Sequence, residues 1–598
     1  MIYAGYIHFN SAQDKINKLI TAINSLIPTN AKIIIKNSLV LCYGKISDEQ
    51  DMDDIWENDT SLLLGRVFDK NHNGSFKKED FKNYADLSKK AVLEKIWGKY
   101  VYINLSNSTQ LFEIVLDSTG QLPFFYYPFP DGNILFSSDI EVIFKVLSQK
   151  PEYNLEYLCS YIVHGTSSAI QTPFKNIYEL PPACSLQITK IKRTTTAFWN
   201  PLNSYKTSEK QKKDAVDVLQ STLKPWIAPY KDICVSLSGG LDSSALVYCL
   251  KDLVRKDQSL KALNYFHSQI QSSNELEHAR KVCNETNIEL IEIDTSHSLP
   301  FDPPHRNLPL MPNKPFPGLV SLRWLETIFD NIPQTSSYTF LSGHGSDHIF
   351  MRPPSKKSVT DYFLEKGFKG LEKELKNIAQ FYRDPMFAIA KENLLSLVSY
   401  FFASDKGKRP LNKTNDETPN WIKQELLHKA SPNYVHPIYE DLPRKVIPGK
   451  YDQIDNLYEG INSIHVELMD QISPTHYPFL YEPVVEFALS FPTYELFDNG
   501  YDRYPLRKAV GDRFNTETAW RRDKSQTTGL FQLGIKQNLE YILEICLEGY
   551  FVKQGLVNKE GLHKTITLIG NGDTKHLWPF MYLASIEIFL KLWNEKNL

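Results

Sequence analysis

The chain has 598 residues, of which 42% are hydrophobic and 23% charged, and its formal net charge is −3. That length is too great for one hydrophobic core, so more than one domain is expected. A charge this close to zero, with lysine and arginine spread along the chain, argues against a nucleic-acid partner.

Seven cysteines without a CxxC pair argue against a disulfide or zinc framework and fit a reducing compartment. The first residues lack the basic leader and apolar core of a signal peptide. No run approaches the roughly 18 apolar residues of a membrane span. We therefore expect a cytoplasmic protein without a membrane span.

Residues 1–203 are predicted to form a β-rich domain with embedded helices. β-Branched and aromatic residues between turn-forming residues predict strands at Ile2–Phe9, Lys32–Tyr43, Tyr100–Leu105, Leu111–Leu116, Phe124–Tyr127 and Asn133–Phe136. Within this domain, Asp69–Asp80 matches several ligand positions of a calcium-binding EF-hand loop. Its last position holds the shorter Asp80, and the preceding LLLGRVF indicates a strand rather than an entering helix. We favour a polar loop that leads into a helix at Lys77–Ala91, with calcium binding as the alternative.

A polar stretch that begins at Ser204 is expected to link this domain to a second one, residues 204–598. Strands are predicted there at Ile233–Leu237, Ala262–His267, Ile288–Ile293 and Tyr338–Leu341, and helices at Asp214–Leu223, Ser243–Val254, Glu275–Asn284 and Leu319–Asp330. This alternation predicts an α/β fold with a doubly wound parallel sheet, whose ligands lie at the carboxyl ends of the strands. After Asp347 the chain is expected to be mostly helical.

The strand at Ile233–Leu237 ends in the motif SGGLDSS, residues 238–244, which leads into a helix. Glycines let the backbone approach a phosphate, and the N–H groups and dipole of the helix face the negative charge. A carboxylate in such a place is repulsive unless a divalent cation lies between it and the phosphates, so Asp242 indicates Mg²⁺. The alternative is an ordinary glycine-containing turn with a serine cap. The candidate phosphate-binding residues are Leu237, Ser238, Gly239, Gly240, Asp242, Ser243 and Ser244.

A second motif, SGHGSD at residues 342–347, follows the strand Tyr338–Leu341 and should open at the same edge of the sheet. It adds Gly343 to the candidate binding residues. Asp242 and Asp347 would together hold Mg²⁺ between the phosphates, although Asp347 alone would be taken for a helix N-cap. The proline-rich stretch Leu299–Gly318 should form an extended loop at this edge, either as a substrate wall or as a simple linker.

The two motifs resemble those of asparagine synthetases, β-lactam synthetases and lasso peptide cyclases. In the first domain, DSTGQLPFF at 117–125, SSDIE at 137–141 and TPFKNIYELPP at 172–182 resemble the glutaminase-like domain of asparagine synthetases. The resemblance covers nearly the whole chain. It implies an N-terminal nucleophile (Ntn) glutaminase-like αββα domain, followed by an adenine nucleotide α-hydrolase-like domain. It also implies cleavage of ATP between its α- and β-phosphates, with a carboxylate activated as an acyl-adenylate.

Two positions depart from that family pattern. Glutamine-dependent members have a nucleophilic cysteine after the initiator methionine, where this chain has Ile2. A branched alkyl group cannot attack a glutamine amide, so we expect a scaffold without glutaminase activity and an amine from another source. Tyr481 stands where the family has the aspartate of a PFLD motif, which leaves the role of that aspartate in doubt.

Two further regions are catalytic candidates. Lys524, with Arg522 before it, matches an R-x-K loop that in this family brings a lysine to the α-phosphate, although a basic surface cluster is the alternative. His344 occupies a position that is Glu in asparagine synthetases and Tyr in β-lactam synthetases. A neutral imidazole there could accept a proton from an attacking ammonium, or it could only cap the loop or pack against substrate.

The segments LLGRVFD at 63–69 and SGHGSDHIF at 342–350 are most similar to lasso peptide cyclases. That resemblance implies a macrolactam synthetase that joins a side-chain carboxylate of a precursor peptide to the peptide's N-terminal amine. It also implies a leader peptidase and a leader-binding protein as partners, and a role in antibiotic biosynthesis. The alternatives are a small-molecule amide ligase, of the β-lactam synthetase or ammonia-dependent asparagine synthetase type, and a catalytically silent nucleotide-binding homologue.

Overall fold

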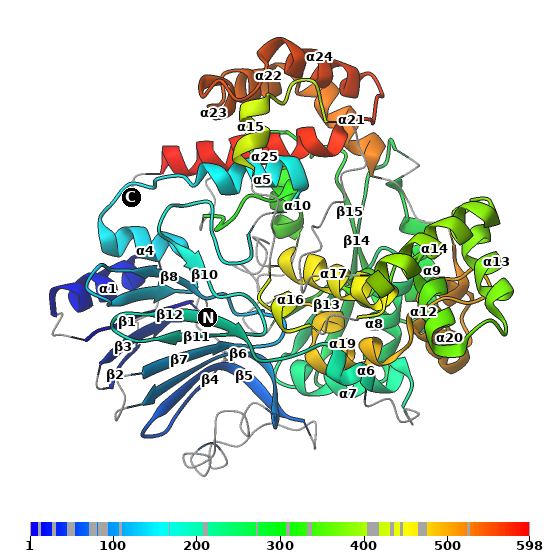
Figure 1. Ribbon diagram of the computed structural model, residues 1–598, viewed down its shortest axis with the longest axis horizontal. Helices are drawn as coiled ribbons and strands as arrows, with labels where there is room; N and C mark the ends of the chain where they lie inside the picture. The colour runs from blue at the N-terminus through cyan, green and yellow to red at the C-terminus, as the bar shows by residue number, and fades with distance from the viewer. Residues whose placement is uncertain are drawn as a thin grey trace.

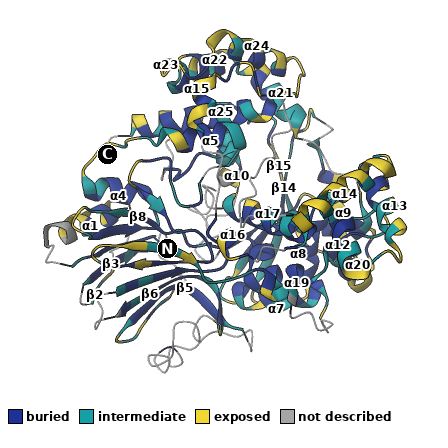
Figure 2. Cartoon of the chain, viewed as in Figure 1, coloured by how far each residue is buried: buried dark blue, intermediate teal, exposed yellow. Residues whose placement is uncertain are grey.

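The computed structural model describes residues 2–9, 13–26, 32–36, 38–44, 54–70, 81, 94–106, 111–166, 168–206, 213–270, 273–305, 311–331, 338–402, 418–430, 436–442, 446–464, 475–522 and 527–596. Figure 1 shows a part built on antiparallel strands beside a part built on a parallel sheet, with a layer of C-terminal helices above them. Figure 2 shows the buried residues concentrated in the sheets and on the inner faces of the helices.

Two six-stranded antiparallel sheets pack face to face in the N-terminal part. The first has the order β10 (Tyr178–Glu179), β8 (Phe125–Pro128), β9 (Ile134–Ser137), β1 (Ile2–Ile7), β3 (Leu39–Gly44) and β2 (Lys32–Lys36). The second has the order β12 (Arg193–Ala197), β11 (Cys184–Ile188), β7 (Leu111–Leu116), β6 (Ile96–Ser106), β5 (Ser61–Asp69) and β4 (Asp54–Glu57). Paired sheets of this kind confirm the predicted glutaminase-like fold.

Side chains of β1 alternate between the two layers of this part, as the period of a strand requires. Tyr3 and Ile7 enter the core between the two sheets. Ile2 and Tyr6 face the opposite side, where α1 (Gln13–Leu26) and α4 (Ile140–Leu147) cover the first sheet. Ile2 is therefore a core residue, with only 5% of its surface exposed.

The strand predicted at Lys32–Tyr43 is wrong in one respect, because the structure has two antiparallel strands there. The pairing places Lys36 opposite Leu39, so the chain reverses between them, where the sequence has the turn-forming residues Asn and Ser. The EF-hand-like segment falls largely outside the described residues. Of its surroundings, Asp69 ends β5 and Phe81 is buried, so calcium binding and the helix at Lys77–Ala91 stay predictions.

A five-stranded parallel sheet forms the centre of the second part. Its order is β15 (Glu289–Asp294), β14 (Ser259–Phe266), β13 (Asp232–Ser236), β16 (Tyr338–Leu341) and β17 (Thr475–His476). Strand order reverses direction at β13, which is where an open α/β sheet binds its ligands. Helices α7 (Ala215–Ile227), α8 (Leu241–Lys251) and α9 (Leu276–Thr286) pack on one face, and α10 (Leu322–Asn331) packs on the other. These findings confirm the predicted doubly wound sheet.

Most of the remaining helices that the structure describes fall into three groups. On the α8 side lie α17 (Pro448–Asn462), α19 (Glu482–Ser490) and α20 (Tyr504–Phe514). A projecting group contains α12 (Ser358–Lys366), α13 (Leu371–Tyr382) and α14 (Met386–Phe402). The upper layer contains α15 (Gln424–Lys429), α21 (Thr528–Gln537), α22 (Leu539–Leu547), α24 (Lys559–Gly570) and α25 (Leu577–Glu595), and it packs on α5 (Leu155–His164) of the N-terminal part.

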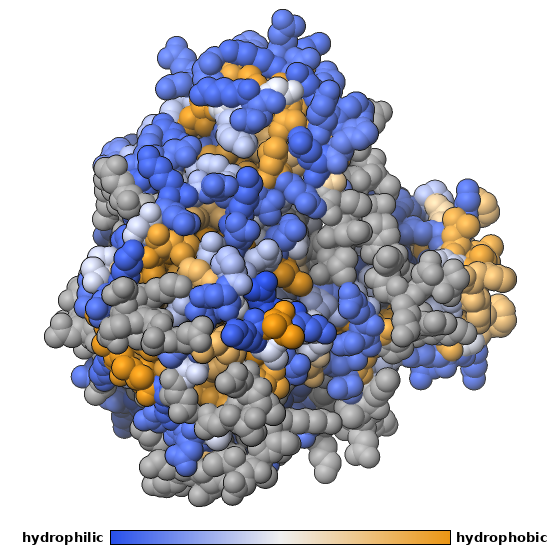
Figure 3. All heavy atoms as spheres, turned by 60° about the vertical axis from the view of Figure 1, so that its left-hand side comes forward, coloured by the Kyte–Doolittle hydropathy of each residue, from blue (hydrophilic) through white to orange (hydrophobic). Residues whose placement is uncertain are grey.

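Helix α14 exposes most of the large hydrophobic side chains that lie at the surface of the described chain. They include Phe387, Leu394, Leu395, Phe401 and Phe402. Figure 3 shows hydrophobic side chains gathered on the part of the molecule that projects at the right. In the part of the chain that the structure describes, no helix is both long and apolar enough to cross a membrane.

Candidate active site

The SGGLDSS loop connects β13 to the N-terminus of α8, as predicted. Gly239 has φ +75°, and a Cβ at this position would lie 2.5 Å from the Cβ of His278, so only glycine fits without strain. The Ser238 N–H donates to the Ser243 hydroxyl at 3.2 Å, which closes the loop on itself. Helix α8 has no side-chain N-cap, so the first N–H groups of the helix are left to bind other acceptors.

The SGHGSD loop after β16 lies against the SGGLDSS loop. A Cβ on Gly343 would lie 2.8 Å from the Ser243 nitrogen and 3.1 Å from the Asp242 carbonyl carbon. Such an approach is possible only because position 343 is glycine. The two strand ends that were predicted to open at one edge are therefore in direct backbone contact.

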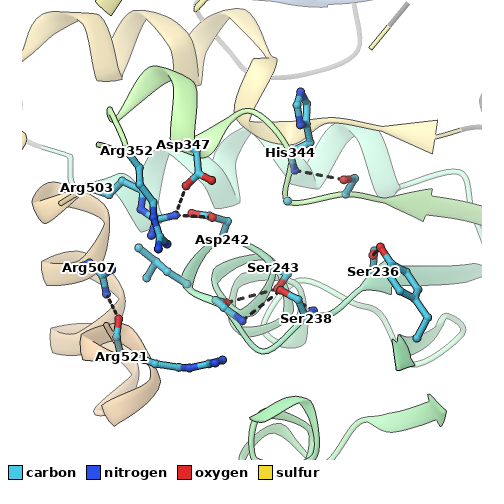
Figure 4. Close-up of a pocket in the computed structure, with 15 residues that line it drawn as sticks. Ser236, Ser238, Asp242, Ser243, His344, Asp347, Arg352, Arg503, Arg507 and Arg521 are labelled. Atoms are coloured by element: carbon cyan, nitrogen blue, oxygen red, sulfur yellow. Dashed lines mark hydrogen bonds and ion pairs between the residues drawn. The ribbon is translucent and has the colours of Figure 1, made fainter. Parts of the chain in front are cut away.

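The carboxylates of Asp242 and Asp347 both bind the guanidinium of Arg503. The Nη1 atom of Arg503 donates to Asp242 Oδ2 at 2.6 Å and also to Asp347 Oδ1. The Nε atom of the same side chain donates to Asp502 Oδ1 at 3.2 Å. Figure 4 shows the two aspartates converging on Arg503 from the two loops. The predicted pair of carboxylates is thus brought together.

Arg503 is almost completely enclosed, with 1% of its side chain exposed. Burial by itself lowers the pKa of this guanidinium, but the charges of Asp242, Asp347 and Asp502 raise it above its usual range. Burial and the neighbouring charge of Arg503 lower the pKa of Arg507. Arg507 nevertheless stays engaged, since it donates to the carbonyls of Ala519 and Arg521 and to the Asp502 carboxylate.

A polar cavity of 240 Å³ opens at the contact between the two loops. Basic and acidic side chains from four segments meet there, which suits an anion accompanied by a cation. Its lining residues are Ser236, Ser238, Gly240, Leu241, Asp242, Ser243, Tyr265, Ser342, Gly343, His344, Asp347, Arg352, Arg503, Arg507 and Arg521. Of the predicted residues, Leu237, Gly239 and Ser244 do not line the cavity but form the loop behind it.

The basic segment after α20 places neighbouring arginines differently. Arg521 donates to the Gly239 carbonyl at 3.2 Å and to Glu275 at 2.8 Å, which attaches this segment to the SGGLDSS loop. Arg522 instead stacks over the Tyr501 ring at 4.1 Å and donates to the Asn499 carbonyl. It is not among the residues that line the cavity. Lys524 lies outside the described residues, so its role and that of Arg522 stay predictions.

His344 lies on the second loop, and its ring is held by the end of α17. Its Nε2 is 3.1 Å from the Gly460 carbonyl oxygen and 2.7 Å from the Ser463 hydroxyl. A carbonyl only accepts, so Nε2 carries the proton and Nδ1 is the basic nitrogen of the neutral ring. Figure 4 shows the ring pointing away from Arg503 and the two aspartates. The base role stays a prediction, and these contacts would fix the tautomer that it needs.

A second cavity, of 430 Å³, adjoins the polar one on the α10 face of the sheet. The two share Ser236, Tyr265 and Ser342. Aromatic and aliphatic side chains dominate its lining, and none of its described lining residues carries a charge. The others are Pro300, Phe316, Gly318, Ser321, Trp324, Leu325, Ile328, Phe340, Ser463, Thr527, Leu530 and Phe531. Residues of the predicted substrate wall, Leu299–Gly318, therefore border this cavity.

Tyr481, which replaces the family's PFLD aspartate, has a packing role here. Its ring stacks on Trp226, with centroids 4.7 Å apart, and also contacts Trp97. With Phe68 these rings form a buried aromatic cluster between the two parts of the molecule. Tyr481 thus contributes apolar packing between the two parts of the molecule, where the family's aspartate would place a charge.

The arginines of the cavity were not predicted as site residues from the sequence. Arg503 and Arg507 lie at the start of α20, whereas Arg352 and Arg521 come from two other segments. The sequence Leu506–Ala509 resembles a family motif that contains Arg507, but no motif groups the four arginines. A further local signal was that basic residues recur between positions 503 and 522.

Family models place this fold and site in a known class. The model described as asparagine synthase matches residues 227–406 and 468–595, and the model described as glutamine amidotransferase domain matches residues 81–199. The first model alone covers more than half of the chain. The chain therefore belongs to the asparagine synthase family, whose members are in general ATP-dependent carbon–nitrogen ligases.

Individual relatives are distant. The chain is similar to the microcin J25-processing protein McjC of Escherichia coli, with 22% identity over 308 residues, which cover 50% of this chain and 49% of McjC. The match thus spans about half the length of that relative. Two solved structures, an allosteric regulatory enzyme of purine biosynthesis and the glutamine phosphoribosylpyrophosphate amidotransferase of B. subtilis, align over 51% of the chain with 11% identity and a TM-score of 0.21. Similarity that low carries no argument about function.

Proposed function

We propose that this protein is a macrolactam synthetase. It would adenylate a side-chain carboxylate of a precursor peptide, release pyrophosphate, and form an amide with the peptide's N-terminal amine. The observation that carries this choice within the family is the uncharged lining of the 430 Å³ cavity in the described residues. Free aspartate or a small β-amino acid brings charged groups that need charged partners when they leave water. A peptide segment with apolar side chains does not.

The source of the amine supports the same choice. Ile2 is buried among apolar side chains at the start of β1, and it offers no nucleophile for glutamine. A substrate that carries its own amine removes the need for ammonia. McjC, by its name, processes microcin J25, and its similarity to this chain supports a peptide substrate.

ATP fits the polar cavity by several features of the described residues. The glycines at 239 and 343 stand where a side chain would collide with neighbouring chain, and the N-terminus of α8 is uncapped. The hydroxyls of Ser244 and Ser346 are buried without a hydrogen-bond partner among the described residues, and acceptor oxygens of a nucleotide would provide one. Arg352 and Arg521 add positive charge for the leaving pyrophosphate.

Mg²⁺ fits through Asp242 and Asp347, since this ion takes one or two carboxylates together with substrate phosphates. When bound, the ion would neutralise charge that develops on the phosphates. The chain's own contribution is to hold the two carboxylates together through Arg503.

The reaction has two displacement steps. A carboxylate oxygen of the peptide attacks the α-phosphorus of ATP, and the bond to the β-phosphate oxygen breaks as pyrophosphate leaves. The amine nitrogen then attacks the acyl carbon, and the C–O bond to the phosphate breaks as AMP leaves. The amine loses two protons, one of which His344 is predicted to accept, and the peptide becomes lighter by one water. Lys524 is predicted to stabilise charge at the phosphorus.

Incubation of the protein with Mg-ATP and a leaderless precursor peptide tests the proposal. We expect pyrophosphate release that depends on the peptide, and a product lighter by one water whose N-terminal amine is blocked. The matched control is Lys524→Ala, which should bind ATP normally and turn over on the order of 10²-fold more slowly. Pyrophosphate release with aspartate and ammonium, but with no peptide, would instead identify a small-molecule amide ligase. ATP binding without pyrophosphate release from any acid would identify a silent homologue.

A further inference from the structure

The outer wall of the apolar cavity is formed by the chain between β15 and α10. Pro300, Phe316, Gly318 and Ser321 from this stretch line the cavity. We call residues 299–305 and 311–321 the cavity wall. It belongs in sequence to the synthetase part, yet much of its packing surface lies against other parts of the molecule.

Two polar contacts attach the cavity wall to the N-terminal part. The Asn313 side-chain oxygen accepts the Ile140 N–H at 2.8 Å, so the wall caps the first turn of α4. The Lys314 ammonium lies 2.9 Å and 2.8 Å from the two oxygens of Glu179, at the end of β10. The side chains of Lys314 and Glu179 are only 10% and 6% exposed. A buried ion pair of this kind fixes geometry, because either charge alone would be unpaired.

A third contact comes from the C-terminal helix. The indole N–H of Trp593 on α25 donates to the Pro312 carbonyl at 3.0 Å. Phe301, Met311, Leu319 and Val320 of the wall share one hydrophobic core with Ile2 and with residues of α5 and α25. The wall is therefore clamped between the glutaminase-like part and α25, and its inner surface faces the cavity.

We infer that the glutaminase-like domain serves to hold the substrate-selecting wall of the synthetase cavity, with Lys314 and Glu179 as positioning residues. Because Ile2 provides no nucleophile, the glutaminase-like domain needs a role other than glutamine hydrolysis. Here its strand β10 and helix α4 fix the wall that would receive apolar side chains beside the reacting carboxylate of the peptide. The specificity consequence rests on the proposed peptide function, whereas the attachment itself does not.

Two variants of the ion pair test this inference in the full-length chain. Lys314→Met leaves a buried carboxylate unpaired, and Glu179→Gln keeps the shape of the side chain while removing its charge. Both should raise KM for the peptide on the order of tenfold or more, because the wall is displaced, while kcat and KM for ATP change little. The charge-reversed double variant, Glu179→Lys with Lys314→Glu, should restore much of the peptide KM.

Lys70→Met is the matched control. Lys70 also pairs with a buried carboxylate across the two parts of the molecule, Glu482 on α19. Its charged neighbours among the described residues, Glu482, Glu486 and Glu94, do not belong to the wall. Its loss should leave the peptide KM unchanged. An equal rise of KM in Lys70→Met and Lys314→Met would overturn the assignment.

Amide hydrogen exchange gives a readout that does not depend on activity. We expect exchange at residues 311–321 to accelerate in Lys314→Met and Glu179→Gln and to stay at the wild-type rate in Lys70→Met. Unchanged exchange in the two wall variants would refute the attachment. Accelerated exchange together with no product from any peptide would leave the attachment standing and refute the proposed function.

Discussion

Arg503 holds two negatively charged side chains together with a single nitrogen. Its Nη1 contacts Asp242 and Asp347, which come from two different loops, and its backbone has φ +51°, in the left-handed region. Without this guanidinium the two carboxylates would repel each other in a largely buried place. The side chain therefore acts as the fixed counter-ion of these two carboxylates.

Replacing Arg503 by methionine should destabilise the protein by about 3–5 kcal/mol, the usual cost of leaving buried charge unpaired. We expect Mg²⁺ to restore part of this loss, because a divalent cation between Asp242 and Asp347 replaces the missing charge. Thermal unfolding with and without Mg²⁺ measures both effects.

Lys450→Met is the control for that measurement. Lys450 is completely buried and donates to the Leu489 and Phe491 carbonyls, away from the two aspartates. Its loss should lower the melting temperature without a response to Mg²⁺. If Mg²⁺ stabilised both variants equally, the two aspartates that Arg503 neutralises would not form a cation site.

Individual site residues could be predicted where a short motif of glycines and an aspartate follows a predicted strand. SGGLDSS and SGHGSD each contain glycines and an aspartate directly after a strand, so their place at the sheet edge followed from the strand assignment. Arg503 could not be found in that way, since it lies 261 positions from Asp242 and 156 from Asp347. Its role depends on how α20 packs against α8, which a local pattern does not contain.

At the scale of elements, a buried carboxylate joins α12 to the start of α17. Asp361 on α12 accepts the Gly449 N–H at 2.8 Å and the Thr493 hydroxyl at 2.6 Å. The pKa of this carboxyl is raised to about 7, mainly by burial and in part by the charge of Asp452. The two hydrogen bonds and the charge of Lys450 lower the pKa but do not cancel these effects. The protonated form is thus favoured when these helices are packed.

Asp361→Asn should make this junction independent of pH. Because the folded pKa is raised, Asp361 favours folding below the unfolded pKa near 4, and that contribution is lost as the pH rises through about 7. Between pH 4 and 8 the wild type should therefore lose on the order of 4 kcal/mol relative to the variant. Denaturant unfolding at several pH values measures the difference.

The amide preserves both contacts, since its oxygen can accept from Gly449 and its nitrogen can donate to Thr493. Asp573→Asn, at an exposed surface position, serves as the control and should leave the pH profile unchanged. A constant difference between wild type and Asp361→Asn across this pH range would contradict the assignment.

Four of the five strands of the parallel sheet were predicted with bounds close to those observed, because each is an apolar run with turn-forming residues at its ends. The two-residue strand β17 was not predicted, since it is too short to show a pattern. The hairpin of β2 and β3 was missed for the opposite reason. Apolar residues continue on both sides of one Asn-Ser pair, so the pattern of the sequence resembles a single long strand. The antiparallel pairing of β2 with β3, which runs from Lys32 opposite Tyr43 to Lys36 opposite Leu39, distinguishes the hairpin from a single strand.

At the scale of the whole molecule, one hydrophobic core crosses the predicted boundary between the domains. It contains Ile2 and Tyr6 of β1, residues of α5, and residues of α25 such as Phe580 and Trp593. No local pattern predicts that a C-terminal helix returns to the N-terminal sheet. The domain boundary predicted between residues 203 and 204 therefore stays a prediction. Residues from both sides of that boundary pack into the same hydrophobic core.

Residues 1–203 and 204–598 should each fail to fold when expressed separately, because either piece exposes its half of that core. A full-length chain cut between residues 206 and 213 after folding should instead stay together. Size-exclusion chromatography distinguishes the outcomes. A monodisperse, cooperatively unfolding 204–598 fragment would show that the shared core is dispensable.

The buried cysteines can serve as natural probes of local unfolding, because each thiol becomes accessible only when its part of the core opens. All seven are buried, and they are spread over several of the hydrophobic cores, with Cys42 and Cys159 in the shared core, Cys184 between the two sheets and Cys249 beside α7. Burial raises the pKa of the Cys42 and Cys159 thiols to about 12, which keeps them unreactive while they are packed. Alkylation with a thiol reagent, resolved peptide by peptide, would thus report the order in which the cores come apart, without an added label.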